Sequence, residues 1–398
     1  MARPLLEVAD IVRSHGCAFL KAHGDTTSSA KRRVLRDIAL CRTAALGGHV
    51  DRCTECGHEE VSYNSCRNRH CTKCLGTASA RWFAARESDL LPVQYFHVVF
   101  TVPAQIAEIS LQNKRVMYDI LMRASAQTLT KVAADPKHLG ARIGFLSVLH
   151  TWGQTLMHHP HVHSIVPGGG LSQDREQWIK SRPNFFLPVK VLGLVFRGKF
   201  LEMTKRAFAQ GKLSFQGTLQ PLNDPDVFAK RLRCCYENSW VVYTKKPFGG
   251  PAQVLKYLAR YTHRVAISNH RLVSSKDGRV SFRWKDYAHN NRKRVMSLDA
   301  CEFLRRFLLH VLPRGFKRIR HYGIFANACR RKSLDRCRDL LCDSKDSENR
   351  PDPQDAPEIE KVPSCPRCKS EKLIRLKLAP DATKIFFMSR SPPGFEAA

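Results

Sequence analysis

Two Cys-x-x-Cys pairs constrain the fold of this chain more than any other feature. The first joins Cys53 to Cys56, the second joins Cys71 to Cys74, and fourteen residues lie between them. Two thiolates at this spacing can hold one Zn²⁺ from a tight turn, and two such turns complete a closed tetrahedral site. We therefore predict a structural zinc ion bound by these four cysteines, in a module at about residues 47–75.

Further potential zinc ligands lie close to these pairs in the sequence. They are Cys41, His49, Cys66 and His70. Four ligands would suffice for a second tetrahedral ion, but buried thiols and surface histidines explain the same residues equally simply. Arg67 and Arg69 lie in the basic loop between Cys66 and Cys71.

A third pair, Cys365 and Cys368, resembles half of a zinc ribbon. Its partners are open, with Cys329, Cys337 and Cys342 as candidates. The chain has fifteen cysteines, and the metal-ligand spacing of the three Cys-x-x-Cys pairs favours a reducing compartment. Charged residues near the start of the sequence, at Arg3, Glu7 and Asp10, do not fit a signal peptide, so we expect a cytoplasmic protein.

The charge of the chain indicates its partner. Sixty-six Lys and Arg residues against 35 Asp and Glu give a formal net charge of +31 and a pI near 9.9. Such a surface attracts polyanions and releases counterions when it neutralises phosphates. Lipid headgroups would attract the same charge, but the sequence has no apolar run of the length that crosses a membrane. We therefore expect nucleic acid as the partner and no membrane association.

The order of the expected elements predicts three regions. Residues 1–90 are expected to be helical around the zinc module, and residues 91–325 to form a core in which strands alternate with helices. Strands are predicted at 95–102, 143–150, the histidine-rich segment that follows, and 239–244, with a hairpin around Asp277-Gly278. Residues 326–398 combine a basic segment, an acidic linker and the third cysteine pair. The fold class is α+β.

His161 and His163 are the candidate ligands of a catalytic metal. They flank one valine in a segment that ends at Gly168, so in a strand both imidazoles leave the same face. The alternative is a pair of half-buried histidines without a ligand role.

Tyr257 and Tyr261 are the candidate nucleophiles. They lie four residues apart in an expected helix that begins at Pro251, so both phenols share one helix face. The alternative is that they pack this helix onto a core. Lys256, Arg260 and Arg264 flank them and can contact phosphates, or form a solvated helix face.

Together these motifs resemble a known family. His161-Val162-His163, followed by Tyr257 and Tyr261 and preceded by the Cys66–Cys71 loop, is similar to the two-tyrosine HUH group of rolling-circle transposases from bacterial insertion sequences, the IS91 family. The similarity extends over about residues 10–330. It implies that a mainly antiparallel sheet flanked by helices carries the histidines, that a neighbouring helix carries the tyrosines, and that a helical zinc-binding domain precedes this HUH endonuclease core.

The resemblance also implies a chemistry and a partner. The enzyme would nick and rejoin single-stranded DNA through a 5′-phosphotyrosine intermediate, acting on element ends and target DNA. Related endonucleases use a third Glu, Gln or His ligand; we predict Gln154, with His150, His159 and His263 as alternatives and packing or DNA contact as its other role. Mg²⁺ or Mn²⁺ is the expected catalytic ion and Zn²⁺ the structural one. Arg67, Arg69, Lys256, Arg260 and Arg264 are the expected DNA contacts.

Two other functions share parts of this pattern. A plasmid replication initiator or a relaxase would use the same nicking and joining chemistry. A zinc-ribbon DNA-binding protein without activity would explain the charge and the cysteines, but not a core of about 230 residues that carries both motifs.

Overall fold

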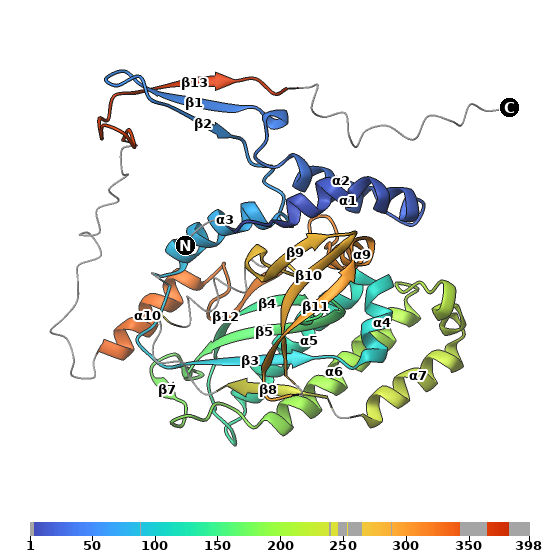
Figure 1. Cartoon of the computed structure of the whole chain (residues 1–398). Coiled ribbons are helices and arrows are strands. Elements are labelled where there is room, and N and C mark those ends of the chain that lie inside the picture. The colour runs from blue at the N-terminus through green and yellow to red at the C-terminus, as the bar shows by residue number, and fades with distance from the viewer. Residues whose placement is uncertain are drawn as a thin grey trace. The chain divides into compact units, whose positions relative to one another are not determined.

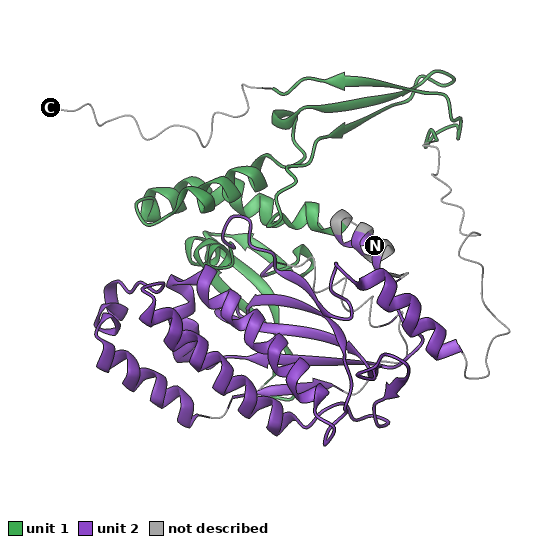
Figure 2. Cartoon of the chain, turned by 180° about the vertical axis from the view of Figure 1, so that it is seen from behind, with its two compact units in different colours: residues 1–77, 267–311, 347–398 green, residues 78–266, 312–346 purple. Residues whose placement is uncertain are grey.

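The chain folds into two compact units that interleave along the sequence. The computed structural model describes residues 4–87, 89–238, 240–245, 253, 265–287, 289–342 and 364–381. Unit 1 comprises residues 1–77, 267–311 and 347–398, and unit 2 comprises residues 78–266 and 312–346 (Figure 2). The sequence predicted consecutive regions instead, with bounds at 1–90, 91–325 and 326–398.

A five-stranded antiparallel sheet forms the centre of unit 2 (Figure 1). Its order is β12-β4-β5-β3-β8, from β3 (Tyr95–Thr101), β4 (Gly144–Trp152), β5 (His158–Pro167), β8 (Val242–Lys245) and β12 (Ile319–Gly323). Every neighbouring pair of these strands is antiparallel. The β-branched and aromatic residues of β3 and β4 fit a pleated, buried surface, and the strands predicted from them are confirmed.

Helices cover one face of this sheet. They are α4 (Ala104–Gln112), α5 (Lys114–Ala134), α6 (Val189–Ala209) and α7 (Pro225–Glu237). Alternate residues of the strands, such as Phe96, Phe100 and Val162, point into the core beneath these helices. The residues between them, including the histidines, therefore belong to the opposite face. Unit 2 also contains β6 (Gly169–Leu171), β7 (Trp178–Lys180) and α10 (Arg330–Cys342), while α3 (Thr72–Glu87) spans the boundary between the units.

Unit 1 joins the first segment of the chain to a segment from its middle. Helices α1 (Val8–His23) and α2 (Ser29–Leu40) belong to the first, and α9 (Ala300–Leu309) to the second. The N–H of Val8 donates to Asn269 Oδ1 over 3.2 Å, which links the two segments. The middle segment forms a sheet in the order β11-β10-β9, from β9 (Leu272–Lys276), β10 (Arg279–Asp286) and β11 (Arg292–Asp299).

The hairpin predicted around Asp277-Gly278 is confirmed. Both residues have positive φ, 51° and 70°, as a two-residue turn between right-twisted strands requires. The second sheet of unit 1 was not predicted. It has the order β13-β1-β2, from β1 (Gly48–Cys53), β2 (Glu59–Tyr63) and β13 (Leu373–Leu378). The zinc module is therefore a mixture of helices and a three-stranded sheet, and not purely helical.

Candidate metal centres

Three histidines from two neighbouring strands form the first candidate metal site. His161 and His163 lie on β5, and His150 on β4 pairs directly with His161. Directly paired residues point to the same side of a sheet, so the three imidazoles share one face. Their ligand nitrogens all lie within 4.8 Å of one another. This distance fits three ligands around a single ion, and the strand spacing predicted for His161 and His163 is present.

Hydrogen bonds fix two of these rings. The Nδ1–H of His161 donates to the backbone carbonyl of His159 over 2.7 Å, which leaves the Nε2 lone pair for a metal. Nδ1 of His163 lies 2.7 Å from Nε2 of His97 on β3, and the two rings are nearly parallel, at 3°. A metal on His163 would therefore bind through Nε2, with His97 orienting the ring from behind.

Burial favours the neutral form of His161, His163 and His97. It lowers the pKa of His161 to about 4 and that of His97 to about 3. The pKa of His163 lies well below its ordinary value for the same reason. Since only the neutral ring has a lone pair for a metal, His161 and His163 are in their ligand form at neutral pH.

Gln154, the predicted third ligand, lies in the turn between β4 and β5, beyond the end of β4 at Trp152. His150, which the sequence offered as an alternative, supplies the third nitrogen in the strand face itself. The ring of His159 lies beside His161, 5.2 Å away between centroids, but outside this group of three. His150, His161 and His163 therefore offer three imidazole nitrogens, and the role of Gln154 as a ligand stays a prediction.

The predicted nucleophiles lie outside the described residues. These are Tyr257 and Tyr261, together with Lys256, Arg260, His263 and Arg264. Their roles remain predictions.

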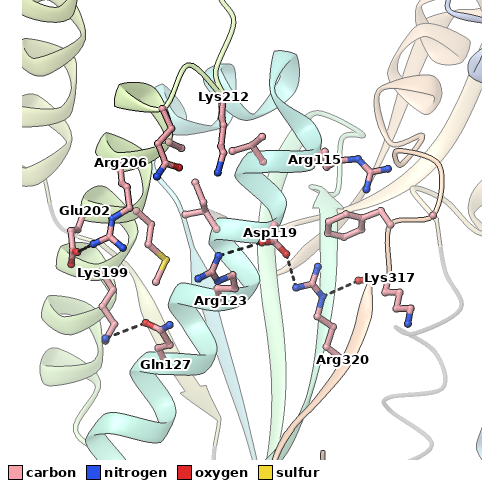
Figure 3. A pocket seen from close by; sticks show the side chains of 17 residues that line it. Arg115, Asp119, Arg123, Gln127, Lys199, Glu202, Arg206, Lys212, Lys317 and Arg320 are labelled. Atoms are coloured by element: carbon pink, nitrogen blue, oxygen red, sulfur yellow. Dashed lines mark hydrogen bonds and ion pairs between the residues drawn. The ribbon is translucent and has the colours of Figure 1, made fainter. Parts of the chain in front are cut away.

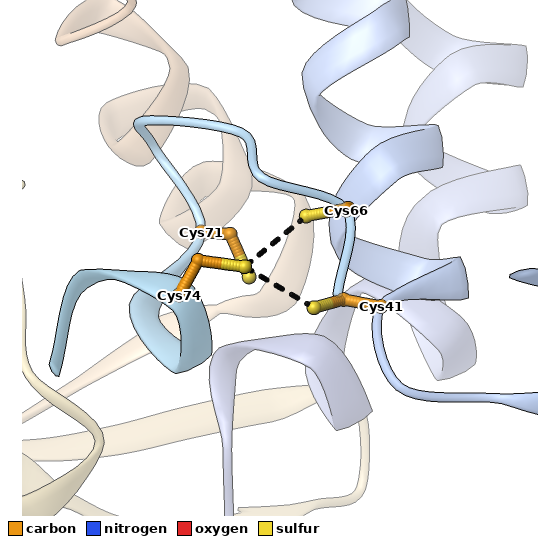
Figure 4. Close-up of side chains that lie close together, drawn as sticks. All are labelled: Cys41, Cys66, Cys71 and Cys74. Carbon is orange, nitrogen blue, oxygen red and sulfur yellow. Dashed lines mark hydrogen bonds between the residues drawn. The ribbon is translucent and has the colours of Figure 1, made fainter. Parts of the chain in front are cut away.

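Four thiols of unit 1 form the second candidate site (Figure 4). They are Cys41, Cys66, Cys71 and Cys74. Cys41 follows the last residue of α2, and Cys74 lies in the first turn of α3. The Sγ of Cys74 is 3.5 Å from that of Cys41 and 3.6 Å from that of Cys66.

Cys53 and Cys56 belong to a third group, and this corrects the predicted pairing with Cys71 and Cys74. Cys53 ends β1 and Cys56 lies in the turn that follows, whereas Cys71 and Cys74 come after the returning strand β2. The hairpin is five residue pairs long, which at about 3.3 Å per residue keeps the two pairs far apart. The thiols of Cys53 and Cys56 instead group with Cys365 and Cys368.

The two histidines considered for the second zinc ion lie outside the thiol groups. Nε2 of His49 is 3.6 Å from a carboxylate oxygen of Asp51, and Nδ1 of His70 is 3.1 Å from Oδ1 of Asn68. Of the two arginines in the loop, Arg67 is exposed and Arg69 is partly buried, which lowers its pKa.

Comparisons with known proteins now identify the family. A sequence model described as "Putative transposase" matches residues 144–333, and one described as "Transposase zinc-binding domain" matches residues 11–102. The chain is 56% identical over 341 residues to "Putative transposase y4qJ" of Sinorhizobium fredii, covering 86% of this chain and 85% of that protein. The chain belongs to the IS91-type transposase family.

A second relative agrees with this assignment. The transposase is 27% identical over 309 residues to the "Transposase for insertion sequence element IS801" of Pseudomonas savastanoi pv. phaseolicola, covering 74% of this chain and 72% of the relative. No solved structure matches it. Among the described residues, no helix of the transposase has the length and apolar character to span a membrane.

The transposase also has a basic cavity of about 730 Å³ on the helical side of unit 2 (Figure 3). Its basic residues come from α5, α6, β12 and the adjoining loops: Arg115, Arg123, Lys199, Arg206, Lys212, Lys317 and Arg320. Two carboxylates also line it. Asp119 pairs with Arg320 over 2.8 Å, and Glu202 with Arg206 over 2.7 Å. Seven cations against two anions leave the cavity positive.

Sequence reasoning missed three parts of this arrangement. His97 is embedded in the apolar run of β3, where a histidine is expected to belong to the core. The partners of Cys53 and Cys56 lie more than 300 residues away, and their matching Cys-x-x-Cys spacing was the available signal. The basic cavity combines residues from α5, α6 and the segment near β12, which no local pattern connects.

Proposed function

We propose that this transposase nicks and rejoins single-stranded DNA through a 5′-phosphotyrosine intermediate, in rolling-circle transposition of an insertion sequence. The observation that supports this most is the group formed by His150, His161 and His163 on one face of an antiparallel sheet. Three neutral imidazoles leave coordination positions for substrate oxygens, whereas four thiolates do not. The chain would act in the cytoplasm on the ends of its element and on target DNA.

A divalent ion held by these histidines would polarise the scissile phosphate and hold it in line for attack. The chain contributes neutral, oriented ligands: the carbonyl of His159 fixes the tautomer of His161, and His97 holds the ring of His163. Nitrogen donors suit Mn²⁺ better than Mg²⁺, so of the two ions first expected we favour Mn²⁺ for tight binding.

Tyr257 and Tyr261 would supply the nucleophiles. The phenol oxygen attacks phosphorus, the bond from phosphorus to the 3′ oxygen breaks, and the departing 3′ oxygen takes up a proton. The phosphodiester energy is kept in the new tyrosine–phosphate bond, so rejoining needs no ATP. Two tyrosines permit two such bonds in succession, one for the donor strand and one for a second cleavage.

The charge of the chain supports DNA as the substrate. The basic cavity between α5 and α6 presents several neighbouring Lys and Arg side chains. A phosphate backbone can bind to these cations without any contact to the bases. This cavity lies on the helical side of the sheet, and the histidines face the other side. We infer that it holds a segment of the DNA away from the scissile phosphate. Lys256, Arg260 and Arg264 would contact the backbone beside the tyrosines, and Arg67 and Arg69 would do so from the zinc module.

The test is the covalent adduct. A single-stranded oligonucleotide that carries an element end is incubated with the transposase and Mn²⁺, and the products are run on a denaturing gel. We expect protein attached to the 5′ phosphate of the fragment downstream of the break, no adduct in EDTA, and no adduct in the Tyr257→Phe/Tyr261→Phe variant. An adduct in that double variant would assign the nucleophile to another residue. Cleavage without any adduct would refute the phosphotyrosine mechanism.

Replication initiators and relaxases share this chemistry, but the chain's family is that of transposases. Transfer of a marked element between two plasmids distinguishes the functions, because an initiator or relaxase would nick DNA without moving the element.

A further inference from the structure

The turns at Cys53–Cys56 and Cys365–Cys368 have the same backbone conformation. In the first, the N–H of Gly57 donates to the carbonyl of Cys53 over 3.0 Å, and the N–H of Cys53 donates to the carbonyl of His58 over 2.9 Å. Gly57, the residue after the second cysteine, has a positive φ of 66°. Such a turn points two sulfur atoms to the same side.

The second turn repeats each of these features. The N–H of Lys369 donates to the carbonyl of Cys365 over 2.9 Å, and the N–H of Cys365 donates to the carbonyl of Ser370 over 2.8 Å. Lys369 has a φ of 64°, a value that costs a non-glycine residue about a kcal/mol and persists where the surroundings fix it. Two turns more than 300 residues apart have therefore adopted one conformation.

The four sulfur atoms are placed as ligands of one ion. The Sγ atoms of Cys53 and Cys368 are 3.5 Å apart, those of Cys56 and Cys365 are 3.6 Å apart, and all four lie within 4.8 Å. Zinc–sulfur bonds of about 2.3 Å in a tetrahedron place sulfurs about 3.8 Å apart. A disulfide would need a sulfur separation of about 2.0 Å, so the arrangement fits an ion and not a covalent pair.

The strand that follows the second turn completes a sheet with the first. β13 pairs with all six residues of β1, from Gly48 opposite Leu378 to Cys53 opposite Leu373. Arg375 makes two contacts with the carboxylate of Asp51, at 2.7 and 2.9 Å. A two-stranded hairpin is marginal in water, and the third strand adds backbone hydrogen bonds and cross-strand contacts to it.

We propose that Cys53, Cys56, Cys365 and Cys368 bind a second structural Zn²⁺, which closes a zinc ribbon between the N-terminal module and the C-terminal segment. The matched zinc-binding family region ends at residue 102, so it contains all four thiols of the first group but only two of this one. Its four ligands are soft, anionic thiolates, and together they leave no open coordination position. Such a site selects zinc over Mg²⁺ or Mn²⁺.

Zinc content per full-length chain is the test, measured by atomic emission on purified protein. We expect the Cys53→Ser/Cys56→Ser variant and the Cys365→Ser/Cys368→Ser variant each to hold one zinc ion fewer than the wild type. The quadruple variant should also lose one ion and not two, because both pairs share it. The matched control, Cys329→Ser/Cys342→Ser, changes two exposed cysteines outside all thiol groups and should keep the wild-type content.

A second readout separates loss of the ion from general unfolding. In the Cys365→Ser/Cys368→Ser variant, trypsin should cut after Arg375 and Lys377, which the paired β13 protects in the wild type. The Cys41 group should still hold its zinc. Wild-type zinc content in the Cys365→Ser/Cys368→Ser variant, or loss of two ions from the quadruple variant, would overturn the proposal. The zinc count does not depend on DNA cleavage, so it tests this proposal separately from the proposed catalytic function.

Discussion

The histidine group of unit 2 and the thiol groups of unit 1 are built in contrasting ways. The histidines come from two adjacent strands of one sheet, and each of two rings is held by a hydrogen bond from behind. The thiols come from turns and helix ends distant in sequence, and each group supplies four ligands. A set of four thiolates saturates its ion and stabilises a fold, whereas three imidazoles on a rigid face leave room for a substrate. The contrast fits a structural role for the thiol groups and the proposed catalytic role for the histidine group.

The largest effect should come from removing a histidine ligand. His163→Ala should lower the rate of single-strand nicking by at least about a thousand-fold, because a bound ion stabilises the transition state by several kcal/mol. Melting temperature and zinc content should stay near wild type. The matched control is His159→Ala, which keeps the backbone carbonyl that orients His161 and should nick normally. Equal nicking by the His163 and His159 variants would remove the catalytic role from the histidine group.

Removing a thiol should change zinc content and stability, the two properties that His163→Ala should leave near wild type. Cys41→Ser should lose one zinc ion and destabilise unit 1 by several kcal/mol, because binding of a structural zinc is itself folding free energy. Circular dichroism and zinc analysis would measure this, with exposed Cys17→Ser as the control. Unchanged zinc content in Cys41→Ser would contradict the assigned group.

His97 tests whether ring orientation matters in the histidine group. His97→Phe keeps an aromatic ring beside His163 but removes the hydrogen bond, and it should weaken Mn²⁺ binding about 10- to 100-fold. Nicking should recover at high Mn²⁺, whereas His163→Ala should not recover. Titration of activity with Mn²⁺ measures the shift. A lower maximal rate at saturating Mn²⁺, with an unchanged half-saturation point, would show that His97 does not act through the metal.

The histidine-bearing unit should be sensitive to acid. Burial lowers the pKa of His158 to about 4, and its Nε2 lies 2.7 Å from the hydroxyl of Tyr118. In the unfolded chain the ring has a pKa of about 6.5, so between these values the unfolded state binds a proton that the folded state does not. The free energy of unfolding should therefore fall by about 2 kcal/mol per such residue as the pH drops from 6.5 to 4.

Tryptophan fluorescence would follow this, since four of the five tryptophans belong to unit 2. His158→Phe should show a shallower fall than the wild type over the same range. Parallel curves for the two proteins would mean that His158 does not contribute.

The smallest effect should come from the basic cavity. Lys199→Glu/Arg206→Glu should weaken single-stranded DNA binding several-fold at moderate salt, and reduce the salt slope by about 0.7 for each lost phosphate contact. Lys131→Glu/Lys205→Glu makes the same charge change on α5 and α6 outside the cavity and is the control. Fluorescence anisotropy at several salt concentrations measures both. Identical slopes for the two variants would mean that net charge, and not the cavity, binds the DNA.

The sequence predicted the local features of the fold well. β3 and β4 follow from runs of β-branched and aromatic residues, and the turn at Asp277-Gly278 follows from the positive φ it requires. Strand periodicity alone predicts that the side chains of His161 and His163 point to the same face of the sheet. The register that brings His150 opposite His161 depends on pairing between strands, which one sequence does not reveal.

Long-range pairing explains the remaining differences. The spacing of Cys53 and Cys56 predicted a metal-binding pair, but their thiols group with Cys365 and Cys368 and not with the nearest second pair in the sequence. The length of the β1–β2 hairpin decides this, since it carries the first pair away from Cys71 and Cys74. The matching spacing of the third pair made it a candidate partner, and the pairing of β13 with β1 brings it to Cys53 and Cys56.

The pairing of β1 with β13 delays completion of this sheet during synthesis. When the ribosome releases β1, its partner strand is still more than 300 residues from being made, and at about 5–20 residues per second the delay is on the order of 15 to 60 seconds. Throughout that time the outer edge of β1 stays open. A nascent or prematurely terminated chain can therefore complete the Cys41 group but not the ribbon, so the finished sheet marks a polypeptide that has been translated past residue 378.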